Sequence, residues 1–187
     1  MDAYLELRLR PDPEFSADLL LNALFAKLHR ALVSHGEGRI GVSFPDVHPA
    51  AGHLGGRVRL HGQAADLAHL MAQPWLLGMR DHLADFAIAP VPEGALHRIV
   101  RRVQAKSSVA RQRRRLMRRC GVDAAAAVAA IPDHAAERLT LPCVVLTSRS
   151  TQQQFRLFIA HLPLQPTASV GRFSAYGLSD DASIPWF

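Results

Sequence analysis

The sequence predicts an α+β protein: a ferredoxin-like domain, in the order β-α-β-β-α-β, followed by a smaller α+β domain that carries an arginine-rich helix. Three observations support this class. The N-terminus alternates apolar and polar residues as a strand does, a helical apolar pattern follows it, and the composition changes abruptly after Pro90–Gly94. A chain of 187 residues can hold one or two domains. We therefore expect the ferredoxin-like domain over residues 1–93 and the second domain over residues 94–187.

The first two elements have the clearest patterns. Residues Tyr4–Arg10 place every second side chain on an apolar face, which predicts a half-buried strand. Ser16 is a suitable N-cap for a helix that runs to about Ser34, and Gly36 can end it. The apolar positions with helical spacing are Leu20, Leu21, Leu24, Phe25, Leu28, Ala31 and Leu32.

The rest of the first domain follows from shorter patterns. Strands are predicted at Arg39–Phe44 and Arg57–His61, separated by a loop rich in Pro, Gly and His. Ala64–Met71 has helical spacing, and the helix is expected to resume over Pro74–His82. Asp85–Ala89 is predicted to be a short fourth strand.

The second domain begins with an extended segment, His97–Gln104. Ser107 or Ser108 is expected to cap a helix that ends near Cys120, and an alanine-rich helix follows over Asp123–Ile131. The remainder is predicted to be β-structure with a turn, in the order Val144–Thr147, the turn Ser148–Gln154, Phe155–His161 and Arg172–Leu178.

The formal charge is distributed unevenly. The chain carries +6 overall, yet the segment Arg98–Arg119 contains ten basic residues, and no acidic residue lies between Glu93 and Asp123. That segment therefore carries +10 and the rest of the chain −4. Such segregation predicts an anionic polymer as the partner.

The arginine-rich helix favours nucleic acid among three alternatives. A solvated helix usually alternates charge signs, and a membrane-surface helix needs more Trp, Phe and Leu on its apolar face. Guanidinium groups in a row can bridge phosphates across a groove. At 100° per residue Arg113 points away from this row, and charge alone does not distinguish DNA from RNA or binding from catalysis. The row consists of Arg111, Arg114, Arg115, Arg118 and Arg119.

Other global features concern the compartment. Cys120 and Cys143 are too few for a disulfide framework or a zinc site. Met1–Arg10 lacks the features of a signal peptide, and the longest apolar stretch, Ala124–Ile131, is too short to span a bilayer. We expect a soluble cytoplasmic protein without a metal or other cofactor.

Six segments, in order and spacing over the whole chain, resemble one family. They are Leu7–Phe15, Arg102–Ser107, Arg111–Arg119, Phe155–Ile159, Tyr176–Ser179 and Pro185–Phe187. The family is the CRISPR RNA-processing endoribonuclease of subtype I-F systems. The departures are local. Residues 124–130 are alanine-rich and less distinctive than the family pattern, and Cys120 stands where a more polar residue would suit RNA.

The resemblance implies a reaction. The family cuts each CRISPR repeat transcript at the base of a stem-loop without a metal ion. The 2′-OH of the RNA is the nucleophile, the products carry a 2′,3′-cyclic phosphate and a 5′-OH, and the enzyme stays bound to its product. The bound product is expected to join other subunits of an RNA-guided interference complex.

The resemblance also assigns three catalytic residues. It implies that His29 is the general base, that Ser148 holds the 2′-OH, and that Tyr176 orients the imidazole or packs beside the cleavage site. From the sequence alone, each has an ordinary structural alternative: a partly buried helix histidine, a turn serine and a strand-edge tyrosine.

The RNA-binding residues follow in the same way. Arg102 and Gln104 are implied to read base edges near the foot of the stem, where their bidentate side chains suit guanine and adenine. Phe155 is implied to stack on the terminal base pair, although core packing on a strand is its ordinary role. Ser150 and Thr151 are near enough in sequence to contact the scissile phosphate. The phosphates of the RNA major groove are implied to meet Arg114, Arg115, Arg118 and Arg119.

Three functions therefore stay open at the level of sequence. The first is a metal-independent endoribonuclease, and the second is a module that binds the hairpin without cutting it. The third is a DNA-binding regulator that places the arginine helix in a B-form groove.

Overall fold

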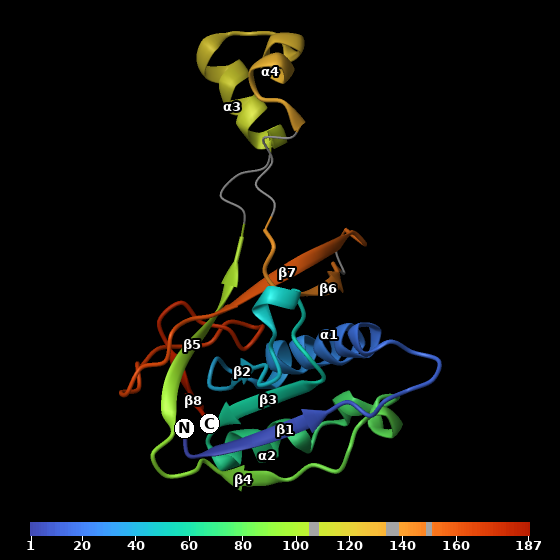
Figure 1. Ribbon diagram of the computed structural model, residues 1–187, viewed down its shortest axis with the longest axis vertical. Helices are drawn as coiled ribbons and strands as arrows, with labels where there is room; N and C mark the ends of the chain where they lie inside the picture. The colour runs from blue at the N-terminus through green and yellow to red at the C-terminus, as the bar shows by residue number, and fades with distance from the viewer. Residues whose placement is uncertain (105–108, 134–138, 149–150) are drawn as a thin grey trace. The chain divides into compact units, whose positions relative to one another are not determined.

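The computed structural model describes the chain in four stretches, residues 1–104, 109–133, 139–148 and 151–187 (Figure 1). The predicted α+β class is confirmed: these residues form two four-stranded antiparallel sheets and four α-helices, with additional short 3₁₀ turns. The serines proposed as caps of the arginine-rich helix, Ser107 and Ser108, lie outside the described residues.

The chain forms two compact units, which are described separately. Residues 1–103 and 141–187 make up the first, and residues 104–140 the second. The predicted domain boundary between residues 93 and 94 falls inside the first unit, in the turn that joins its two sheets.

The first sheet has the strand order β2-β3-β1-β4, and all neighbouring strands run antiparallel. The fourth strand, predicted over Asp85–Ala89, begins three residues later and ends one residue later, where its residues pair with β1. The strands are β1 (Ala3–Arg8), β2 (Gly41–Ser43), β3 (Arg57–Gly62) and β4 (Ile88–Pro90).

The helix α1, Ala17–His35, covers the apolar side of this sheet, and its start is the one predicted. The Ser16 hydroxyl accepts a hydrogen bond from the backbone N–H of Leu19 at 3.3 Å, as an N-cap does. All seven apolar positions predicted from the helical spacing are buried. Leu24, Phe25 and Leu28 are completely inaccessible to solvent, so the spacing gave the buried face correctly.

The helix α2, Ala64–Met71, matches its predicted bounds. The predicted resumption over Pro74–His82 is wrong as a helix, because the segment forms two short 3₁₀ turns, η2 (Pro74–Leu76) and η3 (Arg80–His82). Gly78 lies between them with φ +74°, a conformation that interrupts a right-handed helix. A further 3₁₀ turn, η1, occupies Pro49–Ala51.

The second sheet of the first unit has the order β6-β7-β5-β8, again antiparallel. Its strands are β5 (Leu96–Val103), β6 (Cys143–Thr147), β7 (Gln154–His161) and β8 (Ser183–Trp186). Three of these were predicted, whereas β8 was not. Pro185 lies within β8 and is tolerated because β8, paired with β5, forms the edge of this sheet among the described strands.

The prediction of a strand over Arg172–Leu178 is wrong. The segment folds into a turn in which the Gly177 N–H donates to the Ser174 carbonyl at 2.8 Å. Gly177 has φ +69°, which no strand residue adopts. The segment is a loop packed on the edge of β2, where the Val42 N–H donates to the Gly177 carbonyl.

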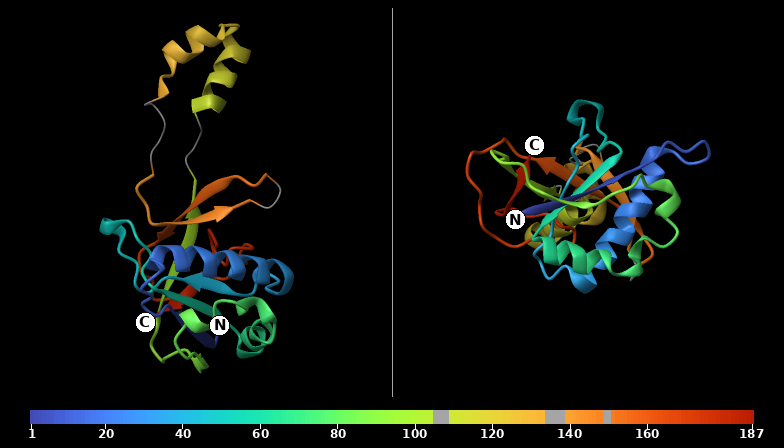
Figure 2. Two further views of the ribbon diagram at one scale, coloured as in Figure 1. Left: turned by 90° about the vertical axis from the view of Figure 1, so that its right-hand side faces the viewer. Right: turned by 90° about the horizontal axis from the view of Figure 1, so that it is seen from below.

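One hydrophobic core runs through the first unit and includes residues of both sheets and α1. The left view in Figure 2 shows α1 running beside the hairpin formed by β6 and β7, and α1 contacts β6. The backbone N–H of Val145 in β6 donates to the Asn22 side-chain oxygen of α1 at 2.8 Å. This bond fixes the second sheet to the helix that covers the first.

The second unit contains α3 (Val109–Cys120) and α4 (Ala124–Ala130). Asp123 caps α4 by accepting from the Ala126 N–H at 2.7 Å. Arg113 donates to the Ile131 carbonyl at 2.8 Å and forms an ion pair with Asp133. The prediction that Arg113 points away from the other arginines of α3 is therefore confirmed, and its side chain joins the two helices.

In the described part of the chain, no helix combines the length and the apolar character that crossing a bilayer requires.

One buried histidine, His61, and one half-buried histidine, His161, make the stability of the first unit sensitive to acid. Burial, with a contribution from Arg59, lowers the pKa of His61 to about 3. Burial, with a contribution from Arg98, lowers the pKa of His161 to about 4. Both imidazoles are therefore neutral in the folded protein, whereas the unfolded chain takes up protons near pH 6.5.

We expect the free energy of unfolding to be highest above about pH 6.5 and to fall as the pH is lowered towards the folded-state values, because the unfolded state then binds more protons. The two histidines together should lower it by about 2–3 kcal/mol between about pH 7.5 and about pH 5.5. Urea unfolding at both pH values measures this. His61→Gln and His161→Gln should each remove about half of the loss, whereas exposed His48→Gln should leave it unchanged. If neither His61→Gln nor His161→Gln altered the pH dependence of the free energy of unfolding, these two histidines would not be its source.

Candidate active site

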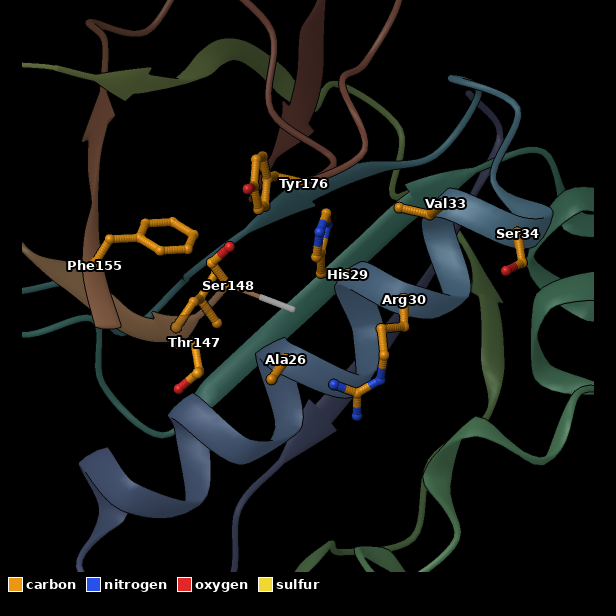
Figure 3. A pocket seen from close by; sticks show the side chains of 10 residues that line it. Ala26, His29, Arg30, Val33, Ser34, Thr147, Ser148, Phe155 and Tyr176 are labelled. Carbon is orange, nitrogen blue, oxygen red and sulfur yellow. The ribbon is translucent and has the colours of Figure 1, made fainter. Parts of the chain in front are cut away.

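A pocket of about 400 Å³ opens in the first unit between α1 and the end of the β6-β7 hairpin (Figure 3). Three of its lining residues are those that the family resemblance assigns to catalysis: His29 from α1, Ser148 from the end of β6 and Tyr176 from the loop before β8. The others are Ala26, Arg30, Val33, Ser34, Leu146, Thr147 and Phe155.

His29 is half-buried, and its hydrogen bond determines which ring nitrogen carries the proton. Nδ1 lies 2.8 Å from the carbonyl oxygen of Ala175. Because a carbonyl oxygen only accepts, Nδ1 must hold a hydrogen and donate it. In the neutral imidazole the lone pair is then on Nε2, which is the nitrogen a general base needs.

Tyr176 contacts the flat face of this imidazole. The two rings are stacked with their centroids 4.2 Å apart and their planes 14° apart. Figure 3 shows the His29 ring directed from α1 towards Tyr176. Ala175 and Tyr176 are adjacent, so one short loop supplies both the hydrogen-bond acceptor and the stacking surface.

The backbone of this loop depends on Gly177. Its φ of +69° disfavours any other residue, and a Cβ at this position would overlap the side chain of Val42 in β2. The close approach allows the Gly177 carbonyl to accept from the Val42 N–H at 2.8 Å. The edge of the first sheet therefore positions Tyr176.

Ser148 begins the turn predicted between β6 and β7. Its N–H donates to the Gln153 carbonyl at 2.9 Å, and its carbonyl accepts from the Gln152 N–H at 2.8 Å. The Thr151 N–H lies 3.3 Å from the Ser148 Oγ. The described residues of the turn thus hold the hydroxyl at the mouth of the pocket, while Thr151 itself is exposed.

Two further predicted binding residues of the first unit, Phe155 and Arg102, lie in the pocket or next to one of its lining residues. Phe155 on β7 pairs with Leu146 of β6 and lines the pocket while remaining partly accessible. Arg102 on β5 places its guanidinium carbon 5.7 Å from the centre of the Tyr176 ring. Ser150 lies outside the described residues.

The predicted phosphate-binding arginines belong to the second unit, as does Gln104, which follows β5 and is exposed. The four predicted phosphate-binding arginines, which lie among the six arginines of α3, are exposed, in contrast to the half-buried Arg113. Arg114 also donates to the Ala110 carbonyl one turn earlier, at 3.3 Å. The four are Arg114, Arg115, Arg118 and Arg119.

Sequence reasoning missed several residues of the pocket. Ala26, Arg30 and Val33 lie three residues before, one after and four after His29 on the same helix. Helical spacing around His29 would have found Ala26 and Val33, because residues three or four apart share a face. The Ala175 carbonyl carries no sequence signal, since every residue has one.

An α+β protein with an imidazole and a hydroxyl in one pocket, and with a helix of exposed arginines in a separate unit, is of a class suited to act on a phosphate-bearing polymer. A family model described as CRISPR-associated protein (Cas_Csy4) matches residues 4–187. The chain belongs to this family, and the resemblance inferred from its sequence is confirmed.

Two relatives match over their full length. A CRISPR-associated endonuclease Cas6/Csy4 from Pseudomonas aeruginosa (strain UCBPP-PA14) is 54% identical over 187 residues, which are 100% of both chains. A protein of the same name from Escherichia coli (strain UTI89 / UPEC) is 46% identical over 187 residues, again 100% of both chains.

The packing of Gly177 leads to a prediction on stability. Gly177→Ala should lower the free energy of unfolding by about 2–4 kcal/mol, because strain at positive φ adds to the overlap with Val42. Gly78→Ala is a matched control: its φ of +74° is similar, but a Cβ there would meet no atom within 4 Å. It should cost only about 1 kcal/mol. Urea unfolding measures both, and equal losses would contradict the role of the Val42 contact.

Proposed function

We propose that this chain is a metal-independent CRISPR RNA-processing endoribonuclease that cuts repeat transcripts at the base of a stem-loop and stays bound to the product. The observation that carries the proposal is the convergence of His29, Ser148 and Tyr176, from three distant segments, on one pocket. Family membership and two full-length relatives named endonucleases support the same reaction class.

In the proposed reaction His29 Nε2 removes the proton of the RNA 2′-OH, and Ser148 Oγ holds that hydroxyl in place. The 2′-oxygen then forms a bond to phosphorus while the bond from phosphorus to the 5′-oxygen breaks. The leaving oxygen takes up a proton, which gives a 5′-OH on one fragment and a 2′,3′-cyclic phosphate on the other. No water is consumed, and no metal ion takes part in the step as proposed.

The position of the imidazole supports its role as a base. The bond from Nδ1 to the Ala175 carbonyl keeps the lone pair on Nε2, and stacking on Tyr176 restricts rotation of the ring. When Nε2 takes the proton, the imidazolium can keep both contacts, because Nδ1 still carries the hydrogen that it donates to the Ala175 carbonyl. Tyr176 would therefore act by positioning His29.

Recognition of the stem is assigned to the basic residues beside the pocket and to the second unit. Arg102 and Gln104 would read base edges at the foot of the stem, and Phe155 would stack on its last base pair. Thr151 and Ser150 would contact the scissile phosphate. The major-groove phosphates would be bound by Arg114, Arg115, Arg118 and Arg119.

Two finer assignments belong with this proposal. The strand order β2-β3-β1-β4, with neighbours antiparallel, supports a ferredoxin-like description of residues 1–93. Binding of the processed RNA by further subunits of an interference complex is proposed from the family resemblance.

Cleavage in the presence of EDTA tests the reaction. We expect a repeat hairpin RNA to be cut under chelation, and a 2′-deoxy substitution at the scissile nucleotide to abolish the cut. Product analysis should show the cyclic phosphate. Tight binding of an intact RNA without cleavage would favour the non-cleaving hairpin module instead. Stronger binding of duplex DNA than of hairpin RNA would favour the DNA-binding regulator.

Two sets of variants separate catalysis from binding. His29→Ala should lower the cleavage rate by about 10²–10⁴-fold with hairpin affinity nearly unchanged, because only the base is lost. The matched control is His48→Ala, an exposed histidine outside the pocket, which should cleave normally. The pair Arg115→Ala and Arg119→Ala should weaken hairpin binding and flatten its dependence on salt. Binding by the arginine variants is measured by filter retention over a salt series. A normal cleavage rate for His29→Ala would exclude His29 as the base.

A further inference from the structure

The pocket continues along α1 beyond the residues that the proposed reaction uses. Arg30 and Ser34 line the pocket together with His29, and both also line a second hollow of about 410 Å³. The second hollow reaches Lys27 and His35 of α1 and Trp75 of η2. The two hollows therefore adjoin at Arg30 and Ser34, and we call them together the α1 trough.

The charge of the α1 trough suits an anion. Among its described lining residues, Lys27 and Arg30 are cationic and none carries a carboxylate. Lys27 donates to the Leu77 carbonyl at 2.8 Å, so it also holds η2 in place. Arg30 is exposed, and within the described part of the chain its side chain has no hydrogen-bond or ion-pair partner. A guanidinium in a concave site without a competing carboxylate is well placed to bind phosphate.

The direction of the α1 trough indicates which part of an RNA would enter it. Arg102, proposed to read the foot of the stem, lies at the Tyr176 end of the pocket. Figure 3 shows the Arg30 side chain on α1 directed away from Tyr176, whereas the His29 ring is directed towards it. A strand that leaves the stem and passes His29 and Ser148 would next reach Arg30.

The other lining groups fit a single strand. Trp75 is partly accessible in the α1 trough and offers an aromatic surface, which single-stranded nucleic acids use for base stacking. The hydroxyl of Ser34, one turn after Arg30, can donate to a phosphate oxygen. A cation, a donor and an aromatic ring along one concave path are the components of a single-strand groove.

We propose that the α1 trough binds the single-stranded RNA that follows the scissile phosphate, with Arg30 on its backbone. This assignment rests on the proposed function and names a part of the substrate that the catalytic and stem-binding residues leave uncontacted. That strand belongs to the fragment released on cleavage. Contacts with this strand would therefore strengthen binding of the substrate but not of the retained product. The enzyme would then bind an uncut transcript more tightly than a product that lacks this strand.

The test compares hairpin RNAs made non-cleavable by a 2′-deoxy scissile nucleotide, so that it does not depend on cleavage. One RNA ends one nucleotide after the scissile position, a second carries about ten further 3′ nucleotides, and a third carries the same extension at its 5′ end. Arg30→Gln is the test variant. Arg10→Gln is the matched control, because Arg10 is exposed and lines neither hollow of the α1 trough.

We expect the 3′ extension to tighten binding by wild type and Arg10→Gln, and Arg30→Gln to lose about 3–10-fold in Kd on that RNA alone. The slope of log Kd against log salt should also fall by about 0.7 for the phosphate contact that is lost. Cleavage of 2′-OH versions by wild type, measured in parallel, reports on the proposed function separately.

Three results would overturn the proposal. An equal loss on all three RNAs would show a general effect of the charge or of the fold. Dependence on Arg30 for the 5′ extension would assign the α1 trough to the other flank. No change in Kd for Arg30→Gln would leave Arg30 as an ordinary solvated surface residue.

Discussion

Burial of the apolar face of α1 is the constraint on which the candidate site depends. Leu24, Phe25 and Leu28 are removed from water completely, and each such side chain contributes about 1.5–3 kcal/mol by transfer from water. With this face fixed in the core, the rotation of the helix is fixed, and His29 is placed at the border of the core. The bond from the Val145 N–H to Asn22 then sets the height of β6 along α1. Ser148, three residues after Val145, is thereby brought to the same pocket.

A second constraint acts through the edge of the first sheet. The Val42 N–H of β2 donates to the Gly177 carbonyl, and this bond holds the loop that contains Gly177. The two residues before Gly177, Ala175 and Tyr176, contact His29. The same loop therefore serves as a structural cover and as the support of the imidazole. A side chain on a loop is held only as firmly as the backbone that carries it. Here that backbone is hydrogen-bonded to a sheet.

The histidines show how burial sorts one residue type into different roles. His61 is completely buried and hydrogen-bonded to Ser43, and burial holds its pKa far below the pH of ordinary buffers. His161 is half-buried and its ring contacts Phe44 of the same core. His29 differs because one nitrogen is satisfied by a backbone carbonyl while the ring borders an open pocket. Its ring is therefore partly exposed and borders the pocket that the proposed reaction uses.

Local patterns in the chain were sufficient for the α+β class, the buried face of α1, the bounds of α2 and the cationic surface of α3. Each of these follows from periodicity or charge within a window of a few residues. The loop over residues 172–178 and the strand β8 could not be found in this way, because their conformations depend on Val42 and on β5, which are far away in the sequence. The candidate catalytic residues were named only through family resemblance. Only the tertiary structure decided that His29 donates from Nδ1 to Ala175, that Tyr176 stacks on it and that Arg30 extends the pocket, because packing between distant segments determines the distances between their side chains.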